Sequence, residues 1–188
     1  MIFANHRNLE NAHAILSPSK YHWINYDAAK MEASYRSYQT TLAGTRDHEF
    51  ASMCIKRKQK LPSRPRTTMA MFVNDAIGFD MASEQVLCYS RNCFGTTDAI
   101  QYHLEDDVTT LRIHDLKTGK SKTHMEQLRV YAAIFCLEYG VEPIDIRIVL
   151  RIYQNCDINE EIADPMEIKR IMDVIVAHDM LIENLMNE

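Results

Sequence analysis

Two aspartates and a lysine lie within or directly after strand-like runs, in a pattern typical of metal-assisted hydrolysis. Asp98 interrupts the apolar run in GTTDAI, and Asp115 and Lys117 follow a second run in IHDLKTGK. Hydrolysis at phosphorus needs a divalent ion that activates water, and hard ions such as Mg²⁺ prefer carboxylate oxygens. Residues two apart in a strand share a face. We therefore expect Asp115 and Lys117 to be exposed in one cleft, while Leu116 points into the core and offers only its carbonyl.

A D-x-K pattern by itself is most often a surface ion pair, because so short a pattern recurs by chance. Here a helix is predicted directly after it, with Gln127 and Tyr131 one turn apart on one face. An upstream helix carries His48, a residue type that alone is more often structural than a ligand. We expect Glu49 to remain a surface acid and His114 to face away from the Asp115 side of its strand.

Taken in order, these elements resemble the PD-(D/E)XK nucleases of the RecB type. That family has a helical His, a GxxD, a (D/E)xK and a QxxxY, and the counterparts here are GTRDHEFA, GTTD, DLK and QLRVY. The segment SPSKYHWINY near residue 20 is similar to the family's N-terminal helix. The family includes nuclease domains of recombination helicases, CRISPR adaptation nucleases and mitochondrial single-strand exonucleases. Each motif is short, and the ordered set, which spans most of the chain, is the specific feature.

The resemblance implies an α/β fold with a restriction-endonuclease-like core, in which helices flank a mixed central sheet. It also implies a site for Mg²⁺ or Mn²⁺. The metal ligands would be His48, Asp98, Asp115 and, through its carbonyl, Leu116. The catalytic residues would be Asp98, Asp115, Lys117, Gln127 and Tyr131, with Lys117 as the catalytic lysine. Gln127 and Tyr131 would hold the scissile strand or the surroundings of that lysine.

The cysteines depart from part of the family. Many relatives hold an iron-sulfur cluster with one Cys before the core and three close together after it, whereas only Cys136 and Cys156 follow Asp115 here. We therefore expect no iron-sulfur cluster. The five cysteines lack CxxC spacing and lie in apolar surroundings, which predicts reduced, buried thiols and a cytoplasmic protein. No apolar run is long enough to span a membrane.

Length and charge set further limits. With 188 residues we expect one nuclease domain over residues 1–188. The net charge of -5 is unusual for a protein that binds nucleic acid, yet residues 144–188 hold ten acidic and four basic residues. The rest of the chain is slightly basic, and a cluster in KRKQKLPSRPR offers phosphate contacts. The residues expected to contact nucleic acid are Lys56, Arg57, Lys58, Lys60, Lys120 and Lys122. A solvated loop with no partner explains the same cluster equally well.

Periodicity predicts the elements that position these residues. Two helices or one kinked helix are expected over about 19–60, and another in TTMAMFVNDAIGFDMA. Three strands follow from about Gln85, and then a helix with Thr123 and Glu126 as a capping box, ending at Gly140. One strand is expected in IDIRIVLRIY. A last helix begins at Asp164 and Pro165, and its apolar stripe is expected to cover the sheet.

The leading hypothesis is a metal-dependent deoxyribonuclease. We expect an exonuclease acting on DNA ends or single strands, in phage or bacterial DNA processing or recombination, with a recombination or replication protein as a possible partner. A structure-specific endonuclease shares the same chemistry. The alternative from another class is a catalytically silent nucleic-acid-binding or inhibitory module. The complete set of two acids and a lysine favours the enzyme.

Overall fold

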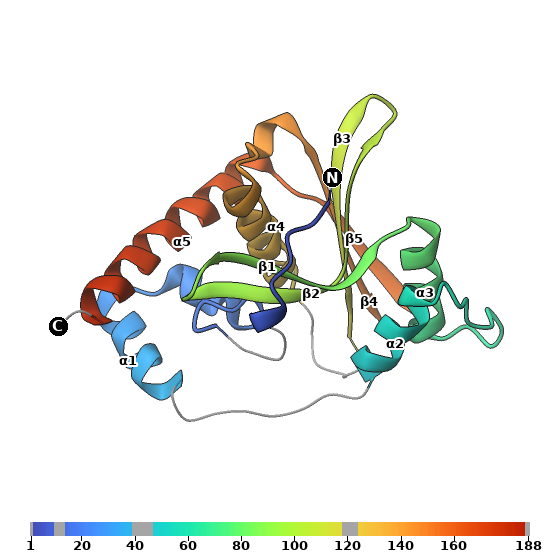
Figure 1. Ribbon diagram of the computed structural model, residues 1–188, viewed down its shortest axis with the longest axis horizontal. Helices are drawn as coiled ribbons and strands as arrows, with labels where there is room; N and C mark the ends of the chain where they lie inside the picture. The colour runs from blue at the N-terminus through green and yellow to red at the C-terminus, as the bar shows by residue number, and fades with distance from the viewer. Residues whose placement is uncertain (1, 10–13, 39–46, 118–123, 187–188) are drawn as a thin grey trace.

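The computed structural model describes residues 2–9, 14–38, 47–117 and 124–186, and its centre is a five-stranded sheet (Figure 1). The strands follow one another across the sheet in chain order. They are β1 (Ala82–Ser90), β2 (Cys93–Glu105), β3 (Val108–Leu116), β4 (Arg147–Gln154) and β5 (Asp157–Ile162). Neighbours are antiparallel except β3 and β4, which are parallel. The protein thus has an α/β fold with a mixed sheet flanked by helices, which agrees with a restriction-endonuclease-like core.

The strands β1, β2 and β3 form the antiparallel meander that the period-two pattern predicts, although β1 begins at Ala82 rather than near Gln85. Asp106 and Asp107 join β2 to β3 and both have positive φ, as in the two-residue turns that match the twist of a hairpin. A helix then connects β3 to β4, because parallel neighbours need a long crossover.

This crossover helix is α4 (Glu126–Tyr139), and Gly140 ends it with φ of 63°, as predicted. The predicted capping box is wrong. The helix begins at Glu126 with Met125 at the N-cap and no side-chain cap, so Glu126 lies in the first helical position instead of the third. Thr123 lies outside the described residues.

Helices cover the two faces of the sheet differently (Figure 1). On one face lies α4, with α5 (Pro165–Met186), α1 (Ala28–Tyr38) and the 3-10 segment η2 (Pro18–Asn25) around it. On the other lie α2 (Asp47–Lys56) and α3 (Thr68–Gly78). Alternate strand residues supply the two cores. Ile100 and Ile113 belong to the α4 side, and Ala99 and Leu116 belong to the α2 and α3 side.

The helices before β1 and after β5 can be compared with the predicted ones. Residues 19–60 contain η2, α1 and α2, and α3 begins after its cap Thr67, as the helical pattern indicated. The last helix begins after Asp164, whose carboxylate accepts from the Met166 N–H at 3.0 Å. Its apolar stripe is buried, but α5 packs chiefly on α4 rather than on the sheet. It therefore forms an outer layer.

Strand β5 was not predicted. Its sequence DINEEI is polar, because it is an edge strand with largely exposed side chains. Asn155 and Cys156 form the tight turn before it, both with positive φ. Cys156 is exposed there, which corrects the expectation of buried thiols. Cys54, Cys93 and Cys136 are buried, Cys88 is half-buried, and all five are free. Among the described residues, no helix is both long and apolar enough to cross a membrane.

Candidate metal and catalytic site

The pairing of β2 with β3 brings the two predicted aspartates face to face. Ala99 pairs with His114 and Ile100 with Ile113, so continuing this register places Asp98 opposite Asp115. Asp115 contacts Gln127 of α4, whereas Asp98 contacts His48 of α2. One oxygen of Asp98, Oδ2, accepts the backbone N–H of Leu116 at 2.7 Å, which fixes this carboxylate against the end of β3.

His48 reaches the other oxygen of Asp98 from the first turn of α2. Its Nδ1 lies 3.0 Å from Asp98 Oδ1, and the ring is partly exposed. The hydrogen bond with Asp98 raises the pKa of His48, while burial opposes that rise. The two oxygens of Asp98 therefore join α2 to the end of β3, and the predicted association of His48 with this aspartate is present.

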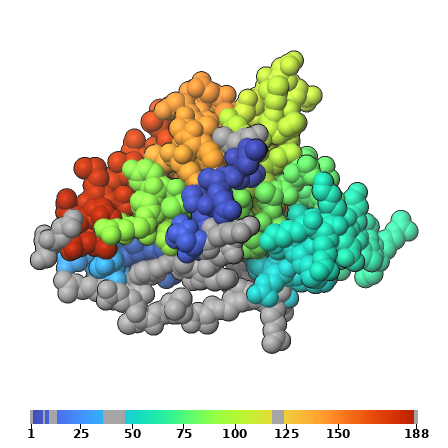
Figure 2. All heavy atoms as spheres, viewed as in Figure 1, coloured from blue at the N-terminus to red at the C-terminus, as the bar shows by residue number. Residues whose placement is uncertain are grey.

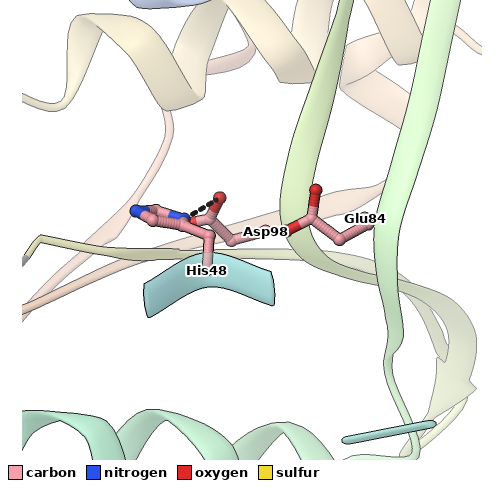
Figure 3. A group of neighbouring side chains, drawn as sticks. All are labelled: His48, Glu84 and Asp98. Atoms are coloured by element: carbon pink, nitrogen blue, oxygen red, sulfur yellow. Dashed lines mark hydrogen bonds and ion pairs between the residues drawn. The ribbon is translucent and has the colours of Figure 1, made fainter. Parts of the chain in front are cut away.

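Glu84 is a member of the site that the sequence did not reveal. It lies on β1 between the paired Ser83 and Gln85, directly across from Asp98. Ligand atoms of His48, Glu84 and Asp98 all lie within 4.8 Å of one another. Figure 3 shows the Glu84 carboxylate directed toward Asp98.

The backbone of Glu84 is unusual for a strand interior. Its φ is 52°, a left-handed conformation that costs free energy for a residue with a side chain. Burial, followed by the charge of Asp98, raises the pKa of Glu84 to about 7. Two acids held this close together favour a bound cation, because a cation relieves their repulsion.

Asp115 belongs to a second, adjoining cluster. Lys117 Nζ lies 2.9 Å from its Oδ2 and 3.1 Å from its Oδ1. Gln127 joins them from the first turn of α4. It accepts from Lys117 at 2.9 Å through Oε1 and donates to Asp115 Oδ1 at 3.3 Å through Nε2. The three side chains therefore form a closed hydrogen-bonded network.

The burial of Asp115 corrects the expectation that it is exposed in a cleft. Only 4% of the residue is exposed, whereas the Lys117 side chain is 30% exposed. Burial and the charge of Asp98 raise the pKa of Asp115 to about 6, and Lys117 opposes this rise. Asp115 thus depends on Lys117 for its counter-charge, and Lys117 is the member of the pair that faces solvent.

The last residue of the QLRVY pattern plays a structural part. Tyr131 is buried, and its hydroxyl donates to the backbone carbonyl of Thr96 in the GTTD segment. Burial raises the pKa of Tyr131 well above its usual value, so the hydroxyl keeps its proton. Gln127, one turn earlier, is a polar neighbour of the same hydroxyl. Tyr131 therefore supports the strand that carries Asp98.

The glycine of the GTTD segment has a steric role. A Cβ at Gly95 would lie 2.7 Å from Pro18 Cδ and 3.2 Å from Tyr131 Cε1. Real side chains do not approach so closely, so only glycine lets η2 and α4 both press against β2 here. Two of the recognised sequence patterns, SPSKYHWINY and QLRVY, therefore meet at this glycine.

Other predicted residues lie as follows. The Leu116 side chain is buried in the core on the α2 and α3 side, and its carbonyl as a ligand stays a prediction. His114 is buried on the face away from Asp115, where its Nδ1 lies 3.2 Å from the Tyr153 hydroxyl. Glu49 is an exposed acid on α2. Each of these three side chains has the orientation that strand or helix geometry predicts.

The predicted nucleic-acid contacts fall at the end of α2 and in the loop after it, which we call the basic segment (residues 56–66). Lys56, Arg57, Lys58 and Lys60 are all exposed. Lys58 forms an ion pair with Asp80 at 2.8 Å. Lys120 and Lys122 lie outside the described residues.

The donor set of His48, Glu84 and Asp98 fits a divalent cation. Ions of this size bind oxygen and nitrogen ligands at roughly 2.0–2.6 Å, so ligand atoms within 4.8 Å of one another can share one ion. Carboxylates suit Mg²⁺ and Mn²⁺, and an imidazole nitrogen favours the transition ion. Asp115 adjoins this group but is not among the residues that gather within 4.8 Å, so its part as a ligand stays a prediction.

Comparison with known proteins does not assign the chain to a family. No family model matches the chain, and no curated protein matches it. Among solved structures, the chain is similar to one described as "Crystal structure of SSO0001", with 12% identity and a TM-score of 0.34 over 80% of this chain and 83% of that chain. A likeness at this TM-score carries no argument about fold or activity, so the site is interpreted from its own geometry.

Proposed function

We propose that the protein is a metal-dependent deoxyribonuclease. The observation that carries the proposal is the meeting of His48, Glu84 and Asp98, from three different elements, within 4.8 Å. Beside this group lies Lys117, a partly exposed cation held by a buried carboxylate. Acidic ligands next to a fixed ammonium group suit a reaction in which negative charge develops on a phosphate.

His48, Glu84 and Asp98 would hold Mg²⁺ or Mn²⁺, with Asp115 and the Leu116 carbonyl as further predicted ligands. When bound, the cation supplies an activated water and neutralises charge at phosphorus. In the reaction, the water oxygen forms a new bond to phosphorus and loses a proton. The bond from phosphorus to one sugar oxygen breaks, and that oxygen leaves with the electron pair and is then protonated.

Lys117 would stabilise the negative charge that builds up on the phosphate oxygens. Gln127 and Asp115 fix its Nζ from two sides, at 2.9 Å each, so little reorganisation is needed when the phosphate binds. Asp98 orients His48 through one oxygen and is held by the Leu116 N–H through the other. The chain thus holds the groups that bind the substrate in fixed positions.

The substrate class follows from the surroundings of the site. The basic segment contacts phosphates without regard to base sequence, which suits an exonuclease that acts on DNA ends or single strands. We propose a role in phage or bacterial DNA processing, with a recombination or replication protein as partner. The free thiols favour a reducing compartment such as the cytoplasm.

Incubation of purified protein with end-labelled single-stranded and double-stranded DNA tests the proposal. Reactions contain Mg²⁺, Mn²⁺ or EDTA, and Asp98→Asn protein is the control for contaminating nucleases. We expect cleavage with either ion, none with EDTA, and loss of at least a hundredfold in the variant. Binding of DNA without cleavage by any ion would support the silent binding module and overturn the nuclease.

A further inference from the structure

Three aromatic rings gather at the surface where η2 meets the start of α4. The ring centroids of Tyr21 and His22 lie 4.4 Å apart, with the planes inclined by 37°. His124 lies just before α4, and its ring centroid is 6.0 Å from that of Tyr21. We call Tyr21, His22 and His124 the ring cluster. It joins two segments that are about a hundred residues apart in sequence.

The ring cluster is not part of the core. The His124 side chain is 46% exposed and His22 is also exposed, while Tyr21 is half-buried with part of its ring packed on the core. An exposed ring forgoes the favourable free energy that burial of its apolar surface would contribute. Exposed aromatic rings are a surface that proteins present to nucleobases.

Its position places the ring cluster next to the proposed site. His124 lies three residues before Gln127, just ahead of α4, and Gln127 accepts from Lys117 at 2.9 Å. On the other side, η2 is pressed against β2 through Pro18 and Gly95, three residues before Asp98. Figure 1 shows η2, in blue, near the end of α4 at which that helix begins. The two segments that carry the ring cluster therefore adjoin Gln127, which contacts Lys117, and β2, which carries Asp98.

We propose that the ring cluster stacks against an unpaired base of the nucleotide next to the phosphate bound at the site, which makes single-stranded DNA the substrate. This inference rests on the proposed nuclease function. Bases in a duplex are covered on both faces by their neighbours, so only an unpaired base can offer a face to these rings. The basic segment would then contact the phosphates of the strand, and the ring cluster would contact its bases.

A binding experiment without cleavage tests the ring cluster directly. Short fluorescein-labelled oligonucleotides are titrated with protein in EDTA, and anisotropy gives the Kd. The test variant is His22→Ala/His124→Ala, since both histidines are exposed and their loss should spare the fold. The control is His103→Ala, an exposed histidine on β2 beside the β2–β3 hairpin. Thermal melting checks that both variants are folded.

We expect the double variant to bind single-stranded DNA about fivefold more weakly than wild type, and the control to bind it equally. Binding of a strand carrying abasic sites in place of bases, or of a duplex, should be unchanged by the substitution. A base analogue whose fluorescence is quenched by stacking, 2-aminopurine, should lose its quenching in the double variant. Equal single-strand affinities, or an equal loss on the abasic strand, would overturn the proposal.

The cleavage assay separates this inference from the proposed function. If wild-type protein cleaves DNA with Mg²⁺ or Mn²⁺ and the double variant binds single strands as tightly as wild type, only the stacking proposal fails. If wild-type protein cleaves nothing with either ion while the double variant still loses base-dependent affinity, the nuclease fails and the ring cluster remains a base-binding surface.

Discussion

Glu84 combines a strained backbone with a carboxylate that lies close to that of Asp98. A left-handed backbone in a strand interior persists only where the surroundings hold it, and here it turns a carboxylate toward a second one on the next strand. Repulsion between the two acids opposes folding without a cation. Bound cation would offset that cost, so we expect the metal to stabilise the folded protein.

The first prediction concerns Glu84→Gln. The amide keeps the size of the side chain but is a weaker ligand for a hard ion, so we expect Mn²⁺ affinity to fall at least tenfold by calorimetry. Cleavage should fall in parallel. Glu49→Gln, an exposed acid on α2, should leave both unchanged. Unaltered Mn²⁺ binding in Glu84→Gln protein would remove this residue from the metal site.

The second prediction concerns the dependence of buried Asp115 on Lys117. Lys117→Met should lower the cleavage rate at least a hundredfold, because the group that stabilises charge on the phosphate is lost. It should also lower the free energy of unfolding by about 1–3 kcal/mol, since a buried carboxylate loses its counter-charge.

The double variant Lys117→Met/Asp115→Asn separates these two effects. We expect it to regain stability in denaturant unfolding, because no unpaired charge stays buried, and to remain inactive. Recovery of cleavage together with stability would mean that Lys117 acts only through the fold.

The order of the motifs allowed most of this site to be predicted. Each of His48, Asp98, Asp115, Lys117 and Gln127 lies in a recognisable short pattern, and the structure gathers them into two adjoining clusters. Glu84 lies in no such pattern. Its place in the site depends on the register of β1 against β2, which a single glutamate near the start of a strand does not reveal.

At the scale of elements, η2 packs closely on β2 at a glycine. The third prediction follows from this contact. Gly95→Ala should lower the free energy of unfolding by about 1–3 kcal/mol, since a new Cβ would lie 2.7 Å from Pro18 Cδ. Gly78→Ala is the matched control, with nothing within 4 Å of the added Cβ at the end of α3. It should be neutral or slightly stabilising in thermal melts.

If Gly95→Ala melts like wild type, then η2 can move away from β2 without loss, and its packing does not position the site. In that case we also expect the position of Asp98 on β2 to be unchanged in the variant. A destabilised but fully active Gly95→Ala protein would instead place η2 among the elements that serve stability alone.

Sequence periodicity predicted the elements with an apolar face and missed those without one. Strand β4 has Ile148, Leu150 and Ile152 buried on one face, and its alternation is plain in the sequence. Strand β5 is a polar edge whose pairing is set by the tight turn at Asn155 and Cys156. The start of α4 was misplaced because Met125, which offers no capping side chain, occupies the N-cap.

At the scale of the whole molecule, the basic segment and the last helix lie far apart. Helix α5, with four acidic and two basic residues, lies on the opposite side of the molecule from the basic segment, which protrudes beyond α2 and α3 (Figures 1 and 2). A net charge of -5 therefore does not describe the surface that DNA would meet. The basic segment follows the last turn of α2 and His48 lies in the first turn, so α2 spans the distance between phosphates bound there and the site.

The last prediction concerns the salt dependence of DNA binding. Lys56, Arg57 and Lys60 are changed to Ser, and Lys58 is kept because it pairs with Asp80 at 2.8 Å. Each lost phosphate contact should reduce the slope of log K against log salt by roughly 0.7–0.9, so the slope should flatten by about 2. Affinity should fall alike on every sequence, with Mn²⁺ binding unchanged. Lys169→Ser/Arg170→Ser, on α5, is the control and should keep the wild-type slope. An unaltered slope in the triple variant would show that DNA approaches the site by another surface.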